Sequence, residues 1–210
     1  MNHPSESVAA RLRTQPGVLR VPTSLLEIYQ QREFLDPVLC GELISLIDSG
    51  RRPSTIADDN GDLSFRTSET CDLPAAHPAV MELERRLGLL ARIPANLGEA
   101  VQGQRYDVGQ EFKPHTDFFT PGGEDFERYC AQAGQRTWTF MVYLNTVESG
   151  GGTRFKAVGK IFQPETGKIL CWNNLRHDGT VNPHTLHHGM KVRKGLKYVI
   201  TKWYREKPWG

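Results

Sequence analysis

The segment Lys113-Pro114-His115-Thr116-Asp117 contains the two side chains around which we expect the fold to be organised. His115 and Asp117 are separated by one residue, and on a β-strand, where successive side chains point to opposite faces, both point the same way. One short strand can therefore supply two neighbouring ligands to a metal ion. His187 offers a third ligand, and it must come from a second strand that folding brings alongside the first.

Two histidines and one carboxylate on one side of an ion form an informative donor set. The remaining coordination positions stay open for a co-substrate and O₂, which is the arrangement used for Fe(II) by oxygen-activating enzymes. A structural zinc site would instead close its coordination shell, usually with cysteines. His115, Asp117 and His187 therefore predict a catalytic ferrous centre.

The third ligand has two competitors, because His184 and His188 lie beside His187 in the sequence. His184 follows a proline in a predicted loop, where we expect a solvated side chain. His188 must point away from His187 on any strand that contains both residues. A histidine and an aspartate at this spacing also occur together by chance, so the assignment depends on the surrounding sequence.

The surrounding sequence is an ordered series of short motifs that extends from Gln104 to Trp203. In chain order the motifs are Arg105-Tyr106-Asp107-Val108-Gly109-Gln110, Gly134-Gln135-Arg136-Thr137, Tyr143-Leu144-Asn145, Gly151-Gly152-Thr153, Pro164-Glu165-Thr166-Gly167, Thr185-Leu186-His187-His188-Gly189, Val192-Arg193-Lys194-Gly195-Leu196-Lys197 and Thr201-Lys202-Trp203. This series resembles the prolyl 4-hydroxylase branch of the Fe(II)/2-oxoglutarate dioxygenases.

The resemblance implies a role for each matching residue near the metal. His115, Asp117 and His187 match the iron ligands, and Lys197 matches the residue that binds the remote carboxylate of 2-oxoglutarate. A buried dianion needs a fixed cation, because a desolvated carboxylate is costly unless it is paired. Tyr106 matches a tyrosine that hydrogen-bonds the same co-substrate, and Tyr143 is a second candidate for that task.

Lys197, Tyr106 and Tyr143 each have a structural alternative. Lys197 lies in a basic run with Arg193 and Lys194, where a solvated strand edge is common. Its position relative to His187 and its apolar neighbours favour a buried cation instead. The two tyrosines could equally be half-buried aromatic residues of a sheet.

The resemblance also implies a peptide-binding surface and its chemistry. Arg136 and Trp203 match positions that face the peptide, and Arg66 lies in a segment that resembles one folding over the substrate groove. The family often has tyrosine and histidine at the positions held here by Phe112 and Arg205, and both departures concern the groove. We therefore expect hydroxylation of a C–H bond of a prolyl residue in a peptide or protein, with Fe(II), 2-oxoglutarate, O₂ and ascorbate, and with release of succinate and CO₂.

Three other functions remain open from the sequence. The first is hydroxylation of a free amino acid or another small molecule, and the second is a catalytically silent metal-binding jelly-roll module. The third, a nucleic-acid demethylase of the same superfamily, would use arginine in place of Lys197 and a basic groove with stacking aromatic residues. With a net charge of +2 over 210 residues, we expect no nucleic-acid partner, and nothing in the sequence specifies an oligomeric state.

Composition indicates a soluble protein in a reducing compartment. The chain is 38% hydrophobic with a mean hydropathy of −0.48, and it has no apolar stretch of the length that spans a membrane. Its first residues lack the basic and apolar regions of a secretion signal, so we expect a cytoplasmic protein without a membrane partner. Cys40, Cys71, Cys130 and Cys171 form no close pair and are expected to be reduced thiols.

Local patterns place helices early and strands late. Asp36 and Pro37 begin an amphipathic helix that ends at Gly50, and a second helix runs from Pro78 to a point before Pro94. Strands are predicted over 137–144, 168–172 and 196–204. We predict one domain over 1–210, mainly β with flanking helices, in which a double-stranded β-helix (jelly-roll) dioxygenase core over about 99–206 rests on a helical support over about 1–98.

An insert over 118–135 lies between the predicted ligands and the next strand. It contains Pro121, Gly122 and Gly123 followed by acidic residues. A loop of this composition beside a site is either a lid or ordinary surface.

Overall fold

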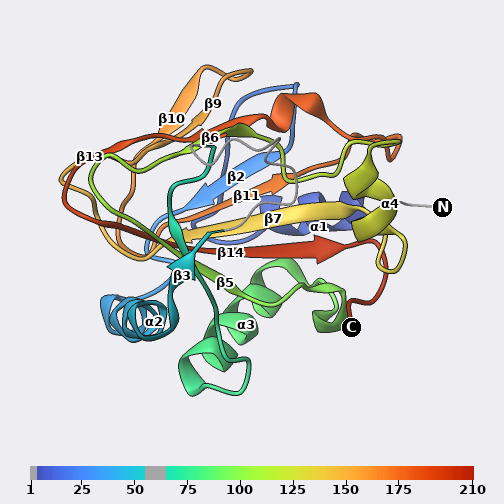
Figure 1. Ribbon diagram of the computed structural model, residues 1–210. Coiled ribbons are helices and arrows are strands. Elements are labelled where there is room, and N and C mark those ends of the chain that lie inside the picture. The colour runs from blue at the N-terminus through green and yellow to red at the C-terminus, as the bar shows by residue number, and fades with distance from the viewer. Residues whose placement is uncertain (1–3, 55–64) are drawn as a thin grey trace.

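The computed structural model describes residues 4–54 and 65–210. Within these residues a large sheet of eight strands lies between a smaller sheet of four strands and a layer of helices (Figure 1). The helices, in chain order, are α1 (Pro4–Arg13), α2 (Pro37–Gly50), α3 (Pro78–Ala91), the 3₁₀ turn η1 (Ala95–Leu97), α4 (Glu124–Cys130) and the 3₁₀ turn η2 (Pro183–Thr185).

The large sheet has the order β1-β2-β11-β7-β14-β5-β4-β3, and its pairs are antiparallel. Its strands are β1 (Leu19–Arg20), β2 (Ile28–Gln31), β3 (Arg52–Pro53), β4 (Glu69–Asp72), β5 (Gln102–Tyr106), β7 (Arg136–Tyr143), β11 (Ile169–Asn173) and β14 (Lys197–Arg205).

The smaller sheet has the order β10-β9-β12-β6, and β8 and β13 form a separate pair. These strands are β6 (Phe112–His115), β8 (Ser149–Gly150), β9 (Thr153–Phe155), β10 (Lys160–Phe162), β12 (His187–Gly189) and β13 (Val192–Lys194). Two facing antiparallel sheets with a cavity between them are the double-stranded β-helix that the sequence predicted.

The two-residue alternation of β14 separates the helix-facing side of the large sheet from its inner side. Tyr198, Ile200 and Tyr204 belong to the apolar cluster that the helices cover. Lys197, Val199, Thr201 and Trp203 point the other way and line a pocket between the sheets. Because successive side chains alternate, one strand both anchors the helices and supplies a wall of the pocket.

The two predicted helices form close to their expected limits. Asp36 caps α2, and its Oδ1 accepts a hydrogen bond from the Leu39 backbone N–H at 2.9 Å. α2 ends at Gly50 as predicted, but without a left-handed turn, because the next residue, Arg51, is extended. A Cβ atom at Gly50 would lie 2.9 Å from Cys71 Sγ, so close packing against β4 requires glycine there.

The predicted helical support over about 1–98 contains the expected helices, but its described part also contains four strands that the sequence did not predict. β1 and β2 form one edge of the large sheet, and β3 and β4 form the other. These strands contain only two to four residues, too few for an alternating pattern to stand out in the sequence. The three longer strands predicted in the second half are confirmed to within one residue at each end as β7, β11 and β14.

All four cysteines are free and buried, as expected for reduced thiols. Among the described residues, no helix combines the length and the apolar composition that a membrane crossing requires.

Burial of α2 on the sheet predicts a large difference between two truncations on this helix. Leu43 is fully buried in the apolar cluster, whereas 72% of Val38 is exposed. We expect Leu43→Ala to lower the free energy of unfolding by about 2 to 5 kcal/mol, since it leaves a cavity. The matched control, Val38→Ala, should change it by less than about 0.5 kcal/mol. Urea denaturation measures both values, and equal midpoints for the two variants would contradict this packing.

Candidate active site

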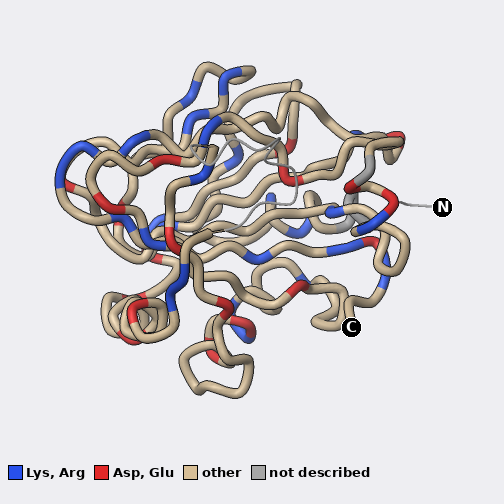
Figure 2. Tube along the Cα trace, viewed as in Figure 1, with Lys and Arg blue, Asp and Glu red and all other residues tan. Residues whose placement is uncertain are grey.

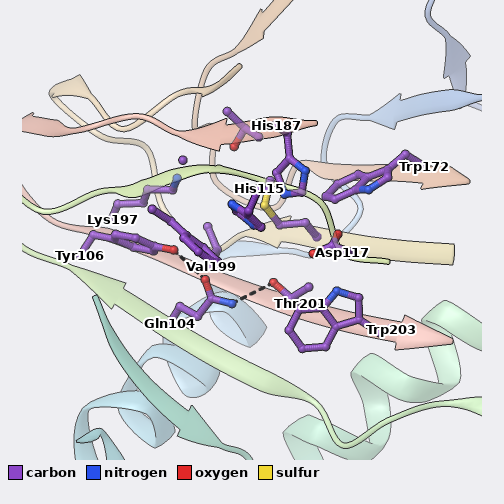
Figure 3. Close-up of a pocket in the computed structure, with 14 residues that line it drawn as sticks. Gln104, Tyr106, His115, Asp117, Trp172, His187, Lys197, Val199, Thr201 and Trp203 are labelled. Atoms are coloured by element: carbon purple, nitrogen blue, oxygen red, sulfur yellow. Dashed lines mark hydrogen bonds between the residues drawn. The ribbon is translucent and has the colours of Figure 1, made fainter. Parts of the chain in front are cut away.

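Three side chains with metal-binding atoms meet at the edge of the pocket between the sheets. The ligand atoms offered by His115, Asp117 and His187 all lie within 4.8 Å of one another. His115 is the last residue of β6 and stands directly opposite His187 of β12 in the antiparallel pair. The structure therefore brings together the three residues that the sequence selected (Figure 3).

The predicted placement of His115 and Asp117 on a single strand is wrong in detail. β6 ends at His115, and Asp117 lies in the bend that follows. Its carboxylate is instead held from another strand, because the Thr139 hydroxyl of β7 donates to Asp117 Oδ2 at 2.7 Å. A side chain beyond the end of a strand is directed by such contacts rather than by strand alternation.

Backbone carbonyl groups fix both imidazole rings in the state that binds a metal. His115 Nδ1 lies 2.8 Å from the Lys113 carbonyl oxygen, and His187 Nδ1 lies 3.0 Å from that of Thr185. A carbonyl oxygen only accepts, so each Nδ1 carries the proton and each Nε2 keeps its lone pair. Burial, reinforced by the nearby His187, also holds the pKa of His115 well below its usual range, which keeps the ring neutral.

These donors fit ferrous iron. Two neutral imidazoles and one carboxylate, without a thiolate, match the set used for non-haem Fe(II) and leave positions open on the pocket side. His188 takes no part, since its ring bonds Glu111 on the other face of β12 at 2.9 Å. His184 lies in η2 and does not line the pocket.

Lys197 is a buried cation without an acidic partner. It is 2% exposed, and its Nζ makes no hydrogen bond or ion pair with any described residue. Burial lowers the pKa of this ammonium group to about 7. Its nearest aromatic neighbours are the rings of Tyr106 and Tyr143, whose centroids lie 4.9 and 5.7 Å from Nζ. An unpaired charge in such a place is costly, so the pocket is suited to an anion from outside.

Cross-strand pairing places Lys197 beside a chain of polar groups. Lys197 stands opposite Tyr106 in the pairing of β14 with β5. The Tyr106 hydroxyl donates to Gln104 Oε1 at 2.8 Å, and Gln104 Nε2 donates to Thr201 Oγ1 at 3.1 Å. Figure 3 shows Lys197 and Tyr106 at one end of the pocket and Trp203 at the other, with the two histidines between them. Sequence reasoning missed Gln104 and Thr201, although alternation from Tyr106 and Lys197 would have found both.

Tyr143 lies next to Lys197 but does not line the pocket. Its hydroxyl lies 2.6 Å from Thr153 Oγ1 and 3.1 Å from the Phe162 carbonyl oxygen. Of these residues, only Thr153 lines the pocket.

A wider groove of about 1060 Å³ opens outside the edge of the barrel that carries the three candidate ligands. His115, Asp117, Phe112 and Trp203 line both the groove and the inner pocket, so the two spaces meet at the metal-binding residues. Arg66 and Arg136 also line the groove, which brings together the three residues predicted to face a peptide.

Glu99 fixes the position of Arg136. Its two carboxylate oxygens accept from Arg136 Nε and Nη2 at 2.6 and 2.7 Å, and the guanidinium group lies 4.0 Å from the Trp203 ring centroid. Arg205 lies 3.4 Å from the same carboxylate. Sequence reasoning missed Glu99, since an isolated acidic residue before a strand carries no pattern.

Arg66 is held in the groove by neutral groups. Its Nε donates to Ser68 Oγ at 3.2 Å, and its Nη2 donates to Thr70 Oγ1 and Gln102 Oε1 at 3.1 and 3.0 Å. Burial lowers the pKa of this guanidinium group, and no described residue forms an ion pair with it.

The insert over 118–135 contains α4, a short helix that the sequence did not predict. Tyr129 of α4 stacks on Phe119 with ring centroids 5.3 Å apart, and both side chains line the groove. The Tyr129 carbonyl also accepts a hydrogen bond from Arg205. In this structure the insert forms part of the groove wall.

Comparisons with known proteins give a consistent result. Residues 101–205 match the model of the 2OG-Fe(II) oxygenase superfamily. Prolyl 4-hydroxylase 5 of Arabidopsis thaliana is 32% identical over 195 residues, which cover 81% of this chain and 65% of that protein. Prolyl 4-hydroxylase 1 of the same plant is 30% identical, with coverages of 83% and 67%. The chain thus spans about two thirds of the length of these curated relatives, and less than two thirds of the first.

Solved structures show the same fold. The viral collagen prolyl hydroxylase of Paramecium Bursaria Chlorella virus-1, in complex with 2OG, is similar with a TM-score of 0.66 at 25% identity, over 85% of this chain and 95% of that one. A prolyl-4-hydroxylase of Pseudomonas putida has a TM-score of 0.60 at 18% identity, over 98% of this chain and 100% of that one.

The three ligand candidates predict binding of one divalent ion for each chain. We expect Mn(II), a redox-stable substitute for Fe(II), to raise the melting temperature of the purified protein, because a ligand that binds only the folded state stabilises it. His187→Ala should abolish this rise, whereas His184→Ala, the matched control, should retain it. Thermal melts with and without Mn(II) measure the effect. Loss of the rise in His184→Ala alone would move the third ligand to His184.

Proposed function

The chain belongs to the 2OG-Fe(II) oxygenase superfamily, and from this membership we propose that it hydroxylates a prolyl residue of a peptide or protein. The reaction uses Fe(II), 2-oxoglutarate and O₂, and it releases succinate and CO₂. Ascorbate is the expected reductant. The curated relatives named prolyl 4-hydroxylases support this choice of substrate.

One observation carries the proposal: a buried cation without an acid faces the same pocket as a two-histidine, one-carboxylate cluster. The cluster suits iron, and the cation suits the far carboxylate of a dicarboxylate that also reaches the iron. A buried lysine by itself, or a metal-binding cluster by itself, is compatible with several kinds of protein. Together they match an enzyme that binds a metal and an anionic co-substrate side by side.

His115, Asp117 and His187 would hold the iron. Bound ferrous iron supplies the redox chemistry that couples oxidation of 2-oxoglutarate to hydroxylation of an unactivated C–H bond. The chain itself contributes neutral Nε2 donors, a carboxylate fixed by Thr139, and a pocket enclosed by Trp172, Met141 and Val199 that limits access of water.

Lys197 would bind the remote carboxylate of 2-oxoglutarate. Its burial makes the ion pair stronger than one in water, and the absence of a competing acid among the described residues leaves the ammonium group available. Tyr106 would donate to the same carboxylate by turning its hydroxyl from Gln104. Tyr143, the second candidate for that contact, does not line the pocket and would have to leave Thr153 to make it, so its role is to support Lys197 with its ring.

Arg136, Trp203 and Arg66 would contact the peptide. The Arg136 guanidinium group lies over the Trp203 ring and that of Arg66 lies over the Phe112 ring, and these side chains line the groove. An extended proline-containing chain packs well on aromatic surfaces, while guanidinium groups donate to its carbonyl oxygens. A groove of about 1060 Å³ exceeds the needs of a free amino acid and therefore favours a peptide.

Other functions fit the structure less well. A silent binding module has no need for both the metal-binding cluster and the buried lysine. A nucleic-acid demethylase is disfavoured by the lysine in place of arginine and by the mixed charges along the chain, where Asp and Glu lie among Lys and Arg (Figure 2).

The proposed function predicts that the protein converts 2-oxoglutarate to succinate. We expect purified protein with Fe(II) and ascorbate to release succinate from 2-oxoglutarate, and a proline-rich peptide mixture to stimulate this release. Asp117→Ala should abolish it, and Arg136→Ala should raise the KM for peptide with little change in turnover without peptide. Succinate is measured directly, and mass spectrometry locates a hydroxyl group on the peptide. Turnover that depends on Asp117 but ignores every peptide would instead favour a small-molecule substrate.

The buried position of Lys197 predicts that binding of 2-oxoglutarate takes up a proton. Since the pKa of Lys197 is about 7 without ligand, the amine is mostly neutral at about pH 8 and mostly charged at about pH 6. A bound carboxylate favours the charged form and raises this pKa. Binding of 2-oxoglutarate to the Mn(II)-loaded protein should therefore take up a proton at about pH 8 and little at about pH 6.

Calorimetry in two buffers of different ionisation enthalpy measures this uptake. Lys197→Ala should abolish it and weaken binding, whereas Lys194→Ala, an exposed neighbour paired with Glu148, should leave both unchanged. Equal heats in the two buffers at about pH 8 would argue against Lys197 as the binding residue.

A further inference from the structure

Thr139 and Asn174 form a buried hydrogen-bonded relay that ends on Asp117. Thr139 Oγ1 donates to Asp117 Oδ2 at 2.7 Å, and Asn174 Nδ2 donates to Thr139 Oγ1 at 2.9 Å. Thr139 and Asn174 are fully buried, and Asp117 is 6% exposed. Neither Thr139 nor Asn174 lines the inner pocket or the groove, so neither is placed to touch a substrate.

The direction of the relay follows from the groups involved. An ionised carboxylate can only accept, so the single hydroxyl hydrogen of Thr139 must go to Asp117. The Thr139 oxygen is then left to accept, which requires Asn174 to present its N–H group rather than its carbonyl oxygen. Asn174 Oδ1 is consequently buried without a hydrogen-bond partner among the described residues. The bond to Thr139, rather than a partner of Oδ1, therefore sets the orientation of the Asn174 amide.

The relay connects a rigid part of the molecule to a less constrained one. Thr139 lies inside β7 and pairs with Trp172 of β11 and Trp203 of β14. The Asn174 backbone is held on both sides, since its N–H donates to the Thr137 carbonyl at 2.7 Å and its own carbonyl accepts from Asn182 at 2.8 Å. Asp117, in contrast, lies in a bend beyond the end of β6.

We propose that Thr139 and Asn174 are positioning residues that hold Asp117 Oδ2 and thereby leave Oδ1 alone for the metal. A freely rotating carboxylate could present either oxygen, or both, to the ion. Two oxygens on the metal would occupy a position that the co-substrate or O₂ requires. By fixing one oxygen, the relay sets both the affinity for the metal and the number of positions that stay open. This inference rests on the proposed role of Asp117 as a metal ligand.

The test compares substitutions that differ in one hydroxyl group. Thr139→Val removes the donor with little change in shape, and Thr139→Ser keeps it. We expect Thr139→Val to weaken Mn(II) binding by about 10- to 100-fold and Thr139→Ser to stay within about 3-fold of the unchanged protein. The absorption spectrum of the Co(II)-loaded protein should change in Thr139→Val only, because it reports coordination number. Melting of the metal-free variants checks that both are folded.

A double-substitution cycle tests whether Asn174 acts through Thr139. Asn174→Ala should weaken Mn(II) binding less than Thr139→Val does, and the double variant should bind no more weakly than Thr139→Val alone. If the double variant loses Mn(II) affinity by the product of the two single losses, the two residues act independently and the relay is overturned. If Thr139→Val does not fold, Asn174→Ala decides, and unchanged Mn(II) affinity together with an unchanged Co(II) spectrum would overturn the proposal.

Metal binding separates this inference from the proposed function. A protein that binds Mn(II) in a Thr139-dependent way but hydroxylates no peptide would overturn the substrate and leave the relay intact. Peptide hydroxylation by the unchanged protein, together with normal Mn(II) affinity in Thr139→Val, would support the proposed function and overturn the relay.

Discussion

The position of β14 between β5 and β7 is the constraint on which the rest of the structure depends. Its outward side chains, with those of β7, form the surface that α2 and α3 cover, and its inward side chains line the pocket. A shift of register by one residue would exchange the two sets and place Lys197 among the helices. The packing that stabilises the fold therefore also fixes the orientation of the binding residues.

β14 has two buried lysines on opposite faces, and they differ in whether an acidic side chain pairs with them. Lys202 faces the helices, and its ammonium group lies 2.5 Å from a Glu84 carboxylate oxygen of α3. Lys197 faces the pocket and has no such acid among the described residues. A buried cation is costly unless it is paired, so the fold supplies a partner where the charge is structural. Under the proposed function, the partner of Lys197 is the remote carboxylate of 2-oxoglutarate.

Strand alternation and local motifs determined what could be predicted from the sequence. Lys197 and Tyr106 stand opposite each other in the pairing of β14 with β5, whereas His187 lies on β12 of the facing sheet and meets them across the pocket. Asp117 was assigned to a strand that ends two residues earlier. The segment of α4 was expected to be a loop, because Gly122 and Gly123 are typical of loops and the helix that follows them has only seven residues. Thr139, Asn174 and Glu99 were missed because their roles depend on partners far away in the chain. Single polar residues of this kind leave no periodic signal.

The two departures from the resembled family both line the groove, and one of them, Phe112, also lines the inner pocket. Phe112, in place of tyrosine, stacks on the His115 ring with centroids 3.4 Å apart and has the Arg66 guanidinium 4.8 Å from its own centroid. It covers a ligand without offering a hydroxyl group to a substrate. Arg205, in place of histidine, shares Glu99 with Arg136 and joins the groove wall to α4. Neither residue contacts Lys197 or displaces a ligand atom. Because Glu99 pairs with both Arg136 and Arg205, the groove carries more positive charge than it would with a neutral histidine in place of Arg205. Under the proposed function, this added charge concerns the choice of substrate rather than the metal site.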